Sequence, residues 1–362
     1  MTGDPSLYAF KYLWLPHAPL AYYLSGGLML LFGKDIFILR VASACFSLTL
    51  IPLTYFLGKE IFNDKIGVLA ALLMAVAPFT VMWGRWAFID YHLAAVFMTA
   101  SFLFWVRYFK NGGLTSPFWG AVTLSLAVLA NYRTAIFAVP LIYAIALWGE
   151  KPFKPTFILT GIVVTPILLL FGSLYLANGV ILWNIFTFNF LLRPEGVLGG
   201  GLLQNFSHYH LSHFWMLVAS TIFIGTWMCG RLNRIVAILY ITTLILSLAV
   251  TFIPISGSYA IPHFYPYIAI GLAYLTYHVI KRTIKNRKYT VPFLLMILFL
   301  GTPAASTTVH VATSFPVSFW FMTTQNNTDP YRLAEWVNTH TAPTDLVIGS
   351  PHYLWLFNCH SI

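Results

Sequence analysis

Three ionisable side chains of different kinds, Arg85, Asp90 and His92, lie within eight residues of one another. The strongly apolar runs 66–83 and 93–106 flank them on either side. A charge within an apolar membrane segment costs about 2.5 kcal/mol or more unless it pairs or takes part in chemistry. The cluster is therefore a candidate site, and a charge pair in a loop at a membrane surface is the structural alternative.

The residue types in and around this cluster suit phosphate and sugar chemistry. Arginine presents a planar fork that matches phosphate oxygens and keeps its charge in poorly hydrated surroundings, which applies to Arg85 and also to Arg133 and Arg193. A carboxylate such as Asp90 can act as a general base on an acceptor hydroxyl, or orient a sugar through its hydroxyls. Together they indicate transfer of a group from a lipid phosphate to an acceptor outside the cytoplasm.

The composition requires a membrane protein to carry these residues. Of the 362 residues, 59% are hydrophobic and only 8% are charged, and the mean hydropathy is +0.78. A soluble globular protein usually has about 25% charged residues. The formal net charge of +10 is explained by basic residues in loops that stay cytoplasmic, so it does not call for a nucleic-acid partner.

The apolar runs predict an all-α polytopic bundle of about ten spanning helices. A helix needs about 20 apolar residues to cross the hydrocarbon core, and several of these runs are shorter, so a pair of them could be half-helices. The predicted spans are 37–58, 66–83, 91–109, 117–131, 135–149, 155–178, 213–230, 235–255, 264–282 and 289–305. The stretch 17–33 is short for a span, and we expect it to lie in the interface on the outer side.

The distribution of basic residues predicts the orientation. If the loop 59–65 is cytoplasmic, alternation also makes cytoplasmic the loops 107–116, 150–154, 231–234 and 281–288. These five loops hold 13 of the 20 lysine and arginine residues in little sequence, which is the asymmetry expected of the cytoplasmic side. The opposite, extracytoplasmic side then carries Asp90 and the other unusual polar residues.

Composition changes near residue 306, which divides the chain into two predicted domains. Residues 1–305 form the transmembrane domain, with an outer loop and interfacial helix at 1–36. Residues 306–362 read as the beginning of a small α/β extracytoplasmic domain, with a helix at 331–339 and a buried strand at 346–349.

The order and spacing of several motifs resemble one family of membrane enzymes. The motifs are HAPLAYY at 17–23, AALLMAVAP at 70–78, Arg85-x4-Asp90, LAVLANYR at 126–133 and YAIPHFYP at 259–266. In this order they resemble the GT-C glycosyltransferases. More narrowly, they are similar to the dolichyl-phosphate-mannose protein mannosyltransferase and aminoarabinose transferase superfamily.

This resemblance implies a fold, a reaction and a set of site residues. It implies a GT-C bundle that moves a sugar from a polyprenyl (dolichyl or undecaprenyl) monophosphate to an acceptor at the outer membrane face, with inversion. Asp90 matches the second acidic position of the family and is the catalytic candidate. The substrate-binding candidates are Arg85, Arg133, Arg193, His17, His92, His263 and Tyr259.

The start of the chain departs from the family pattern. Relatives carry their main catalytic acid in the first outer loop, after a first helix and well ahead of the segment that matches 17–23. The segment Thr2-Gly3-Asp4 is similar to a later part of that loop, so Asp4 is only a subordinate catalytic candidate. We therefore expect a fragment that lacks the first helix, with the main acid upstream of residue 1 and the outer domain also cut short.

Each candidate has a structural alternative that the sequence leaves open. Asp90 can serve as a helix N-cap, Arg85 can pair with it, and Arg133 can snorkel to the interface. His17 can be a histidine at the membrane interface, and His263 can be a hydrogen-bonded histidine in the core. Arg193 can be an ordinary loop charge.

The resulting interpretation is a multi-pass membrane glycosyltransferase with its active site on the extracytoplasmic face of the plasma membrane. Its partners would be the lipid bilayer, a polyprenyl-phosphate-linked sugar and an acceptor protein, glycan or lipid. No cofactor is required: a divalent metal would be compatible with the chemistry, but His208, His210 and His213 fit no standard metal site. A lipid or glycan transporter or flippase, and an inactive donor-binding subunit, are the alternatives.

Overall fold

The computed structural model describes residues 18–33, 35–76, 84, 89–138, 141–142, 145, 153–186, 263, 265–285, 330–340, 342, 346–347 and 360–361. The chain divides into two compact units, one formed by Leu15–Ala305 and the other by Met1–Trp14 with Ser306–Ile362. The candidate site belongs to the first unit, which is helical throughout its described part.

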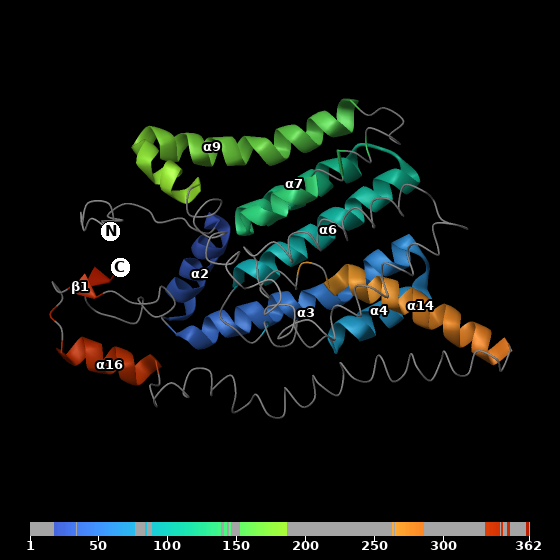
Figure 1. The fold of residues 1–362 in the computed structure, drawn as a ribbon, viewed down its shortest axis with the longest axis horizontal. Helices are drawn as coiled ribbons and strands as arrows, with labels where there is room; N and C mark the ends of the chain where they lie inside the picture. Colours follow the sequence, from blue (N-terminus) through green and yellow to red (C-terminus); the bar gives the residue numbers. More distant parts are fainter. Residues whose placement is uncertain are drawn as a thin grey trace, which may run out of the picture. The chain divides into compact units, whose positions relative to one another are not determined.

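The described elements of the first unit follow the apolar runs (Figure 1). They are α2 (Pro19–Phe32), α3 (Ile36–Ile61), α4 (Asp64–Ala75), α6 (Ile89–Asn111), α7 (Thr115–Ala130), the 3-10 helix η1 (Tyr132–Phe137), α9 (Phe153–Phe186) and α14 (Tyr265–Lys285). Among the described residues, two helices are long and apolar enough to cross a membrane, at Phe37–Ile61 and Ile89–Asn111.

Local sequence fixes where the first helices begin. Asp35 caps α3 by accepting a hydrogen bond from the backbone N–H of Phe37 at 2.8 Å, and Asn63 caps α4 by accepting one from Ile66 at 3.1 Å. Short polar side chains at these positions satisfy backbone donors that have no partner inside the helix. Gly33 ends α2 at a φ of 100°, a left-handed conformation that favours glycine.

Helices α3, α4, α6 and α7 pack as neighbours, with α14 against α4 and α3, and α9 against α7 (Figure 1). Two glycines allow the close approach of α3 and α4. A Cβ added to Gly58 would lie 3.1 Å from the Cα of Gly67, and one added to Gly67 would lie 2.7 Å from the backbone oxygen of Tyr55. Any side chain at Gly67 would therefore push the two backbones apart.

The contact between α6 and α7 depends on a third glycine. Ser101 Oγ donates a hydrogen bond to the backbone oxygen of Gly120 at 2.6 Å. A Cβ added to Gly120 would lie 2.7 Å from Nε1 of Trp105, whose side chain is fully buried. The indole thus occupies the space that the missing side chain leaves.

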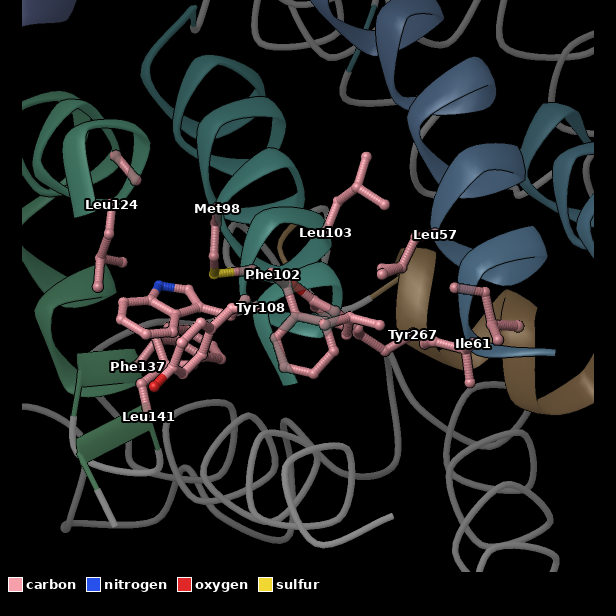
Figure 2. Packing of buried hydrophobic residues seen from close by; sticks show 14 of the residues in the cluster. Leu57, Ile61, Met98, Phe102, Leu103, Tyr108, Leu124, Phe137, Leu141 and Tyr267 are labelled. Carbon is pink, nitrogen blue, oxygen red and sulfur yellow. The ribbon is translucent and has the colours of Figure 1, made fainter. Parts of the chain in front are cut away.

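The main core lies where α3, α6, α7 and α14 meet (Figure 2). Phe102 of α6 and Tyr267 of α14 contact edge to face, with ring centroids 5.2 Å apart. Leu57, Leu124 and Leu141 belong to the same buried cluster. This cluster fixes the helices against one another below the end that carries Asp90.

Ion pairs gather where α3 and α6 end. Glu60 of α3 lies 3.6 Å from Arg107 and 3.5 Å from Lys110 of α6, measured between charged atoms. Lys59 lies 2.8 Å from Asp64 across the α3–α4 turn. Since α3 and α6 both end at these residues, the paired charges lie at the opposite end of the bundle from Asp90. We call this the basic end.

The second unit contains a helix and a short pair of strands in its described part. Helix α16 spans Pro330–His340, and strand β1 (Leu346–Val347) pairs in parallel with β2 (His360–Ser361). The helix and β1 agree with the predicted positions 331–339 and 346–349. The assignment of this unit to an α/β extracytoplasmic domain stays a prediction.

The predicted spans agree with the described helices at most boundaries. The segments 37–58, 91–109, 155–178 and 264–282 correspond to α3, α6, α9 and α14. The predicted span 66–83 corresponds to α4, which begins at Asp64 and ends at Ala75, three residues before Pro78. The spans 213–230, 235–255 and 289–305 lie outside the described residues, so the count of ten stays a prediction.

Candidate functional site

The first turn of α6 presents three consecutive polar or aromatic residues, Asp90, Tyr91 and His92. Successive side chains on an α-helix diverge by about 100°, so three in a row point in three directions. Asp90 lies inside this turn and not at the N-cap, because α6 begins at Ile89. A carboxylate in the first turn is still favoured by the positive end of the helix dipole.

Asp90 acts electrostatically on Tyr22 of α2. Partial burial and the negative charge of Asp90 raise the pKa of Tyr22 to about 12. The phenol is protonated at physiological pH, as an unperturbed tyrosine also is. Tyr22 as a whole residue is 47% exposed.

A buried apolar cluster holds Asp90 and Tyr22 in this region. It consists of Ala21 of α2, Leu39 of α3, Ile89, Leu93 and Ala94 of α6, and Ala130 of α7. Ala21 immediately precedes Tyr22, and Ile89 immediately precedes Asp90. Because small side chains let the backbones approach closely, four helices converge on one place at this end of the bundle.

His92 points from α6 to α3. Its Nδ1 lies 3.4 Å from Oγ of Ser43, and both side chains are fully buried. A Cβ added to Gly84 would lie 2.8 Å from Oγ of Ser47 and 3.9 Å from Nε2 of His92. The imidazole thus lies buried in the α3–α6 interface beside serine hydroxyls, where its contact with Ser43 restricts the rotation of the first turn of α6.

Tyr91 points to the segment that precedes α14. Its ring centroid lies 6.1 Å from that of His263, which is buried. His263 comes two residues before the first residue of α14, Tyr265. The first turn of α6 therefore contacts α3 through His92 and the start of α14 through Tyr91, while Asp90 acts electrostatically on Tyr22 of α2.

Helix α7 ends at the same place. The backbone N–H of Asn131 bonds to Ala127 at 2.8 Å, and Thr134 Oγ1 donates to the backbone oxygen of Asn131 at 2.8 Å. This hydroxyl contact supports the change from α-helix to the 3-10 helix η1. The backbone of Arg133 lies in η1, and its side chain lies outside the described residues.

The structure describes some of the predicted site residues and not others. Asp90, His92 and His263 are described, and all three lie at the end of the bundle where α6 begins. Lying outside the described residues are Asp4, His17, Arg85, Arg193 and Tyr259. Their roles, and the substrate contacts of the described three, stay predictions.

Sequence reasoning did not single out Ser43 or the tyrosines Tyr22 and Tyr132 as site candidates. A signal was present for Tyr22, which lies in the motif 17–23. Tyr132 likewise lies in the motif 126–133. Ser43 is a polar residue inside an apolar span, and nothing in its own neighbourhood indicates that it faces His92.

No metal ligand set is formed by the described residues, because no three His, Cys, Asp or Glu side chains gather among them.

Two comparisons relate this architecture to known proteins. Residues 16–176 match the family model described as dolichyl-phosphate-mannose-protein mannosyltransferase. ArnT from Cupriavidus metallidurans, solved with undecaprenyl phosphate bound, superposes with a TM-score of 0.64 at 13% sequence identity, over 96% of this chain and 76% of that one. The chain has the GT-C fold. The predicted resemblance to the GT-C superfamily, and within it to the mannosyltransferase and aminoarabinose transferase group, is confirmed.

The fold also extends to oligosaccharyltransferases. AglB from Archaeoglobus fulgidus, in complex with an inhibitory peptide and a dolichol-phosphate, matches with a TM-score of 0.61 at 12% identity, over 96% of this chain and 56% of that one. A second structure of the Archaeoglobus enzyme, in complex with Zn and sulfate, matches with a TM-score of 0.59 at 13% identity, over 96% and 54%. This chain thus spans just over half the length of AglB. No curated protein matches the sequence.

Proposed function

We propose that this chain is a membrane glycosyltransferase that moves a sugar from a polyprenyl monophosphate to an acceptor on the extracytoplasmic face, with inversion. The observation that carries the proposal is Asp90, a carboxylate at the end of the bundle where α2, α3, α6 and α7 converge. It lies inside the segment 16–176 that matches the mannosyltransferase family.

The residues have distinct roles in the proposed reaction. The acceptor hydroxyl attacks C1 of the sugar from the side opposite the phosphate, so a single displacement inverts the anomeric centre. Asp90 orients the sugar or the acceptor through its hydroxyls. Arginine side chains, foremost Arg133 on η1, stabilise the charge that develops on the leaving phosphate. The acceptor hydroxyl loses its proton to a carboxylate that acts as general base.

The lipid part of the donor suits this location. The structure of ArnT holds undecaprenyl phosphate and that of AglB a dolichol-phosphate. In this chain the aliphatic tail would lie between helices, with its phosphate near η1. The proposed reaction includes no metal, because guanidinium groups can stabilise a monophosphate leaving group. Transfer assays with a chelator and with added Zn²⁺ test whether the reaction needs a metal.

The positions of charged residues support the proposed orientation. Arg107 and Lys110 lie at the basic end, remote from Asp90. Basic residues collect on the cytoplasmic side of membrane proteins, which leaves Asp90 facing outward. A cysteine introduced at Lys65 in a chain without other cysteines should react with an impermeant maleimide only after the cytoplasmic side is opened.

A transfer assay tests the function. The purified chain in lipid nanodiscs is incubated with radiolabelled polyprenyl phosphosugars and candidate acceptors, and Asp90→Asn and Arg133→Ala are compared with wild type. We expect kcat/KM to fall about 100-fold in each, as misplaced reactants cost rates of that order. Asp64→Asn, which removes a carboxylate at the basic end, is the matched control and should keep wild-type activity.

The outcomes separate the proposal from its alternatives. Unchanged transfer in both variants would remove Asp90 and Arg133 from the site. A chain that binds the phosphosugar without transferring it would be a donor-binding subunit. Movement of labelled lipid across the bilayer without glycosyl transfer would indicate a flippase.

A further inference from the structure

Tyr132 is the first residue of η1, directly after α7 ends. Its hydroxyl oxygen is buried and has no hydrogen-bond partner among the described residues. Its ring contacts Phe171 of α9, with centroids 5.6 Å apart. The ring therefore has a structural role in packing, whereas the hydroxyl has none that the described residues explain.

The position of Tyr132 relates it to the proposed site. Ala130, two residues earlier, belongs to the buried cluster that also contains Ala21 and Ile89. These residues immediately precede Tyr22 and Asp90. The 3-10 helix η1, which begins at Tyr132, therefore starts close to the backbone positions of Tyr22 on α2 and Asp90 on α6.

The chemistry of a buried phenol restricts what it can bind. Burial, and to a smaller extent Tyr22, raise the pKa of Tyr132 above its ordinary value, so the hydroxyl is neutral and carries its proton at physiological pH. A buried hydroxyl without a partner is unfavourable by comparison with a hydrogen-bonded one. The position therefore suits a ligand that brings an acceptor oxygen.

We propose that Tyr132 is a further substrate-binding residue, whose hydroxyl donates a hydrogen bond to a phosphate oxygen of the polyprenyl phosphate. This inference rests on the proposed function, and it identifies one side chain that would bind the phosphate of the lipid donor. The next residue along η1 is Arg133, so the same short helix carries the proposed neutral donor and the arginine that the proposed function assigns to the leaving phosphate.

A phosphate oxygen is preferred to a sugar hydroxyl because an ionised acceptor forms a shorter and stronger hydrogen bond than a neutral one. Such a bond is the better compensation for a buried donor. Tyr22 interacts electrostatically with both Asp90 and Tyr132, so the three residues belong to one neighbourhood.

The test is a binding measurement that does not depend on transfer. Wild type and Tyr132→Phe are titrated with undecaprenyl phosphate and, separately, with undecaprenol, which lacks the phosphate. Phenylalanine keeps the ring contact with Phe171 and removes only the oxygen. We expect Tyr132→Phe to bind undecaprenyl phosphate about tenfold more weakly and to bind undecaprenol like wild type, with an unchanged midpoint of thermal unfolding.

A matched control is Tyr55→Phe, which removes a phenol oxygen that donates to Asp64 at the basic end. It should bind both lipids like wild type. Equal affinity of Tyr132→Phe and wild type for undecaprenyl phosphate would overturn the inference, as would an equal loss for undecaprenol. A wild type that binds the phosphate but transfers no sugar would overturn the proposed reaction and leave the role of Tyr132 supported.

Discussion

Oγ of Ser43 lies 3.4 Å from Nδ1 of His92, across the interface of α3 and α6 and 49 residues apart in the chain. Both side chains are fully buried. Because His92 comes two residues after Asp90 on one helical turn, this contact restricts the rotation of the turn that carries the carboxylate. A polar contact inside the bundle thus positions a group at its end.

Ser43→Ala removes the hydroxyl, so the imidazole of His92 loses this hydrogen-bond partner. The free energy of unfolding should fall by about 1 kcal/mol, the usual net value of one buried hydrogen bond. Transfer should fall severalfold, since the first turn of α6 gains rotational freedom. Thermal unfolding in detergent and steady-state kinetics measure the two effects. Thr49→Ala, which removes a 2.8 Å bond to Cys45 on an exposed face, is the control. Equal effects in both variants would contradict a special role for Ser43.

Gly84→Ala tests the same region from another side. The new Cβ would lie 2.8 Å from Oγ and 2.9 Å from Cβ of Ser47. Rotating the hydroxyl does not relieve the second contact, so either the backbone at residue 84 or that of α3 must shift. We expect transfer to fall more than stability does, because the shift reaches His92 and the first turn of α6. A variant with full activity and a lowered unfolding midpoint would show that Gly84 matters for packing only.

Gly120→Ala should destabilise the pair of helices α6 and α7. Its Cβ would meet Nε1 of the buried Trp105 at 2.7 Å, and overpacking of this kind costs typically about 1–3 kcal/mol. Gly161→Ala on α9 is the matched control, because nothing lies within 4 Å of a Cβ there and alanine favours the helix. The unfolding midpoints of the two variants should therefore move in opposite directions or differ clearly. A Gly120→Ala variant as stable as wild type would mean that the indole can move aside.

Most of the described helices could be predicted from the sequence, because long apolar runs leave the backbone no partner in a membrane except its own helix. The predicted span 37–58 and the observed α3, Ile36–Ile61, differ by a few residues. After Asn131 the prediction differs from the structure at one boundary. Apolar composition favoured a span at 135–149, whereas Tyr132–Phe137 form the 3-10 helix η1, supported by the side chain of Thr134. The described residues beyond η1, at 138, 141, 142 and 145, are α-helical, and the remainder of this span lies outside the described residues.

The contacts of the site could not be predicted in the same way. Helices α3 and α6 are apolar on nearly every side, so their sequences do not indicate which face meets which neighbour. Ser43 and His92 could each be located on a helix, but their pairing depends on the rotation of both helices. Asp90 was identifiable because a carboxylate is rare in such a chain, whereas Tyr22 and Tyr132 are two of 20 tyrosines and differ from the others only in position.

The basic end offers a test of electrostatics that is independent of the site. Asp64 accepts hydrogen bonds from Lys59 and from Tyr55, each at 2.8 Å, and these hold its pKa below the usual value. A carboxyl with a lowered folded pKa contributes stability above its unfolded pKa of about 4 and loses it as the pH falls through the folded value. The unfolding midpoint of wild type should thus exceed that of Asp64→Asn by a constant, small amount between about pH 5 and pH 8. The difference should vanish in more acidic solution. A difference that grows as the pH falls would contradict the pairing of Asp64 with Lys59.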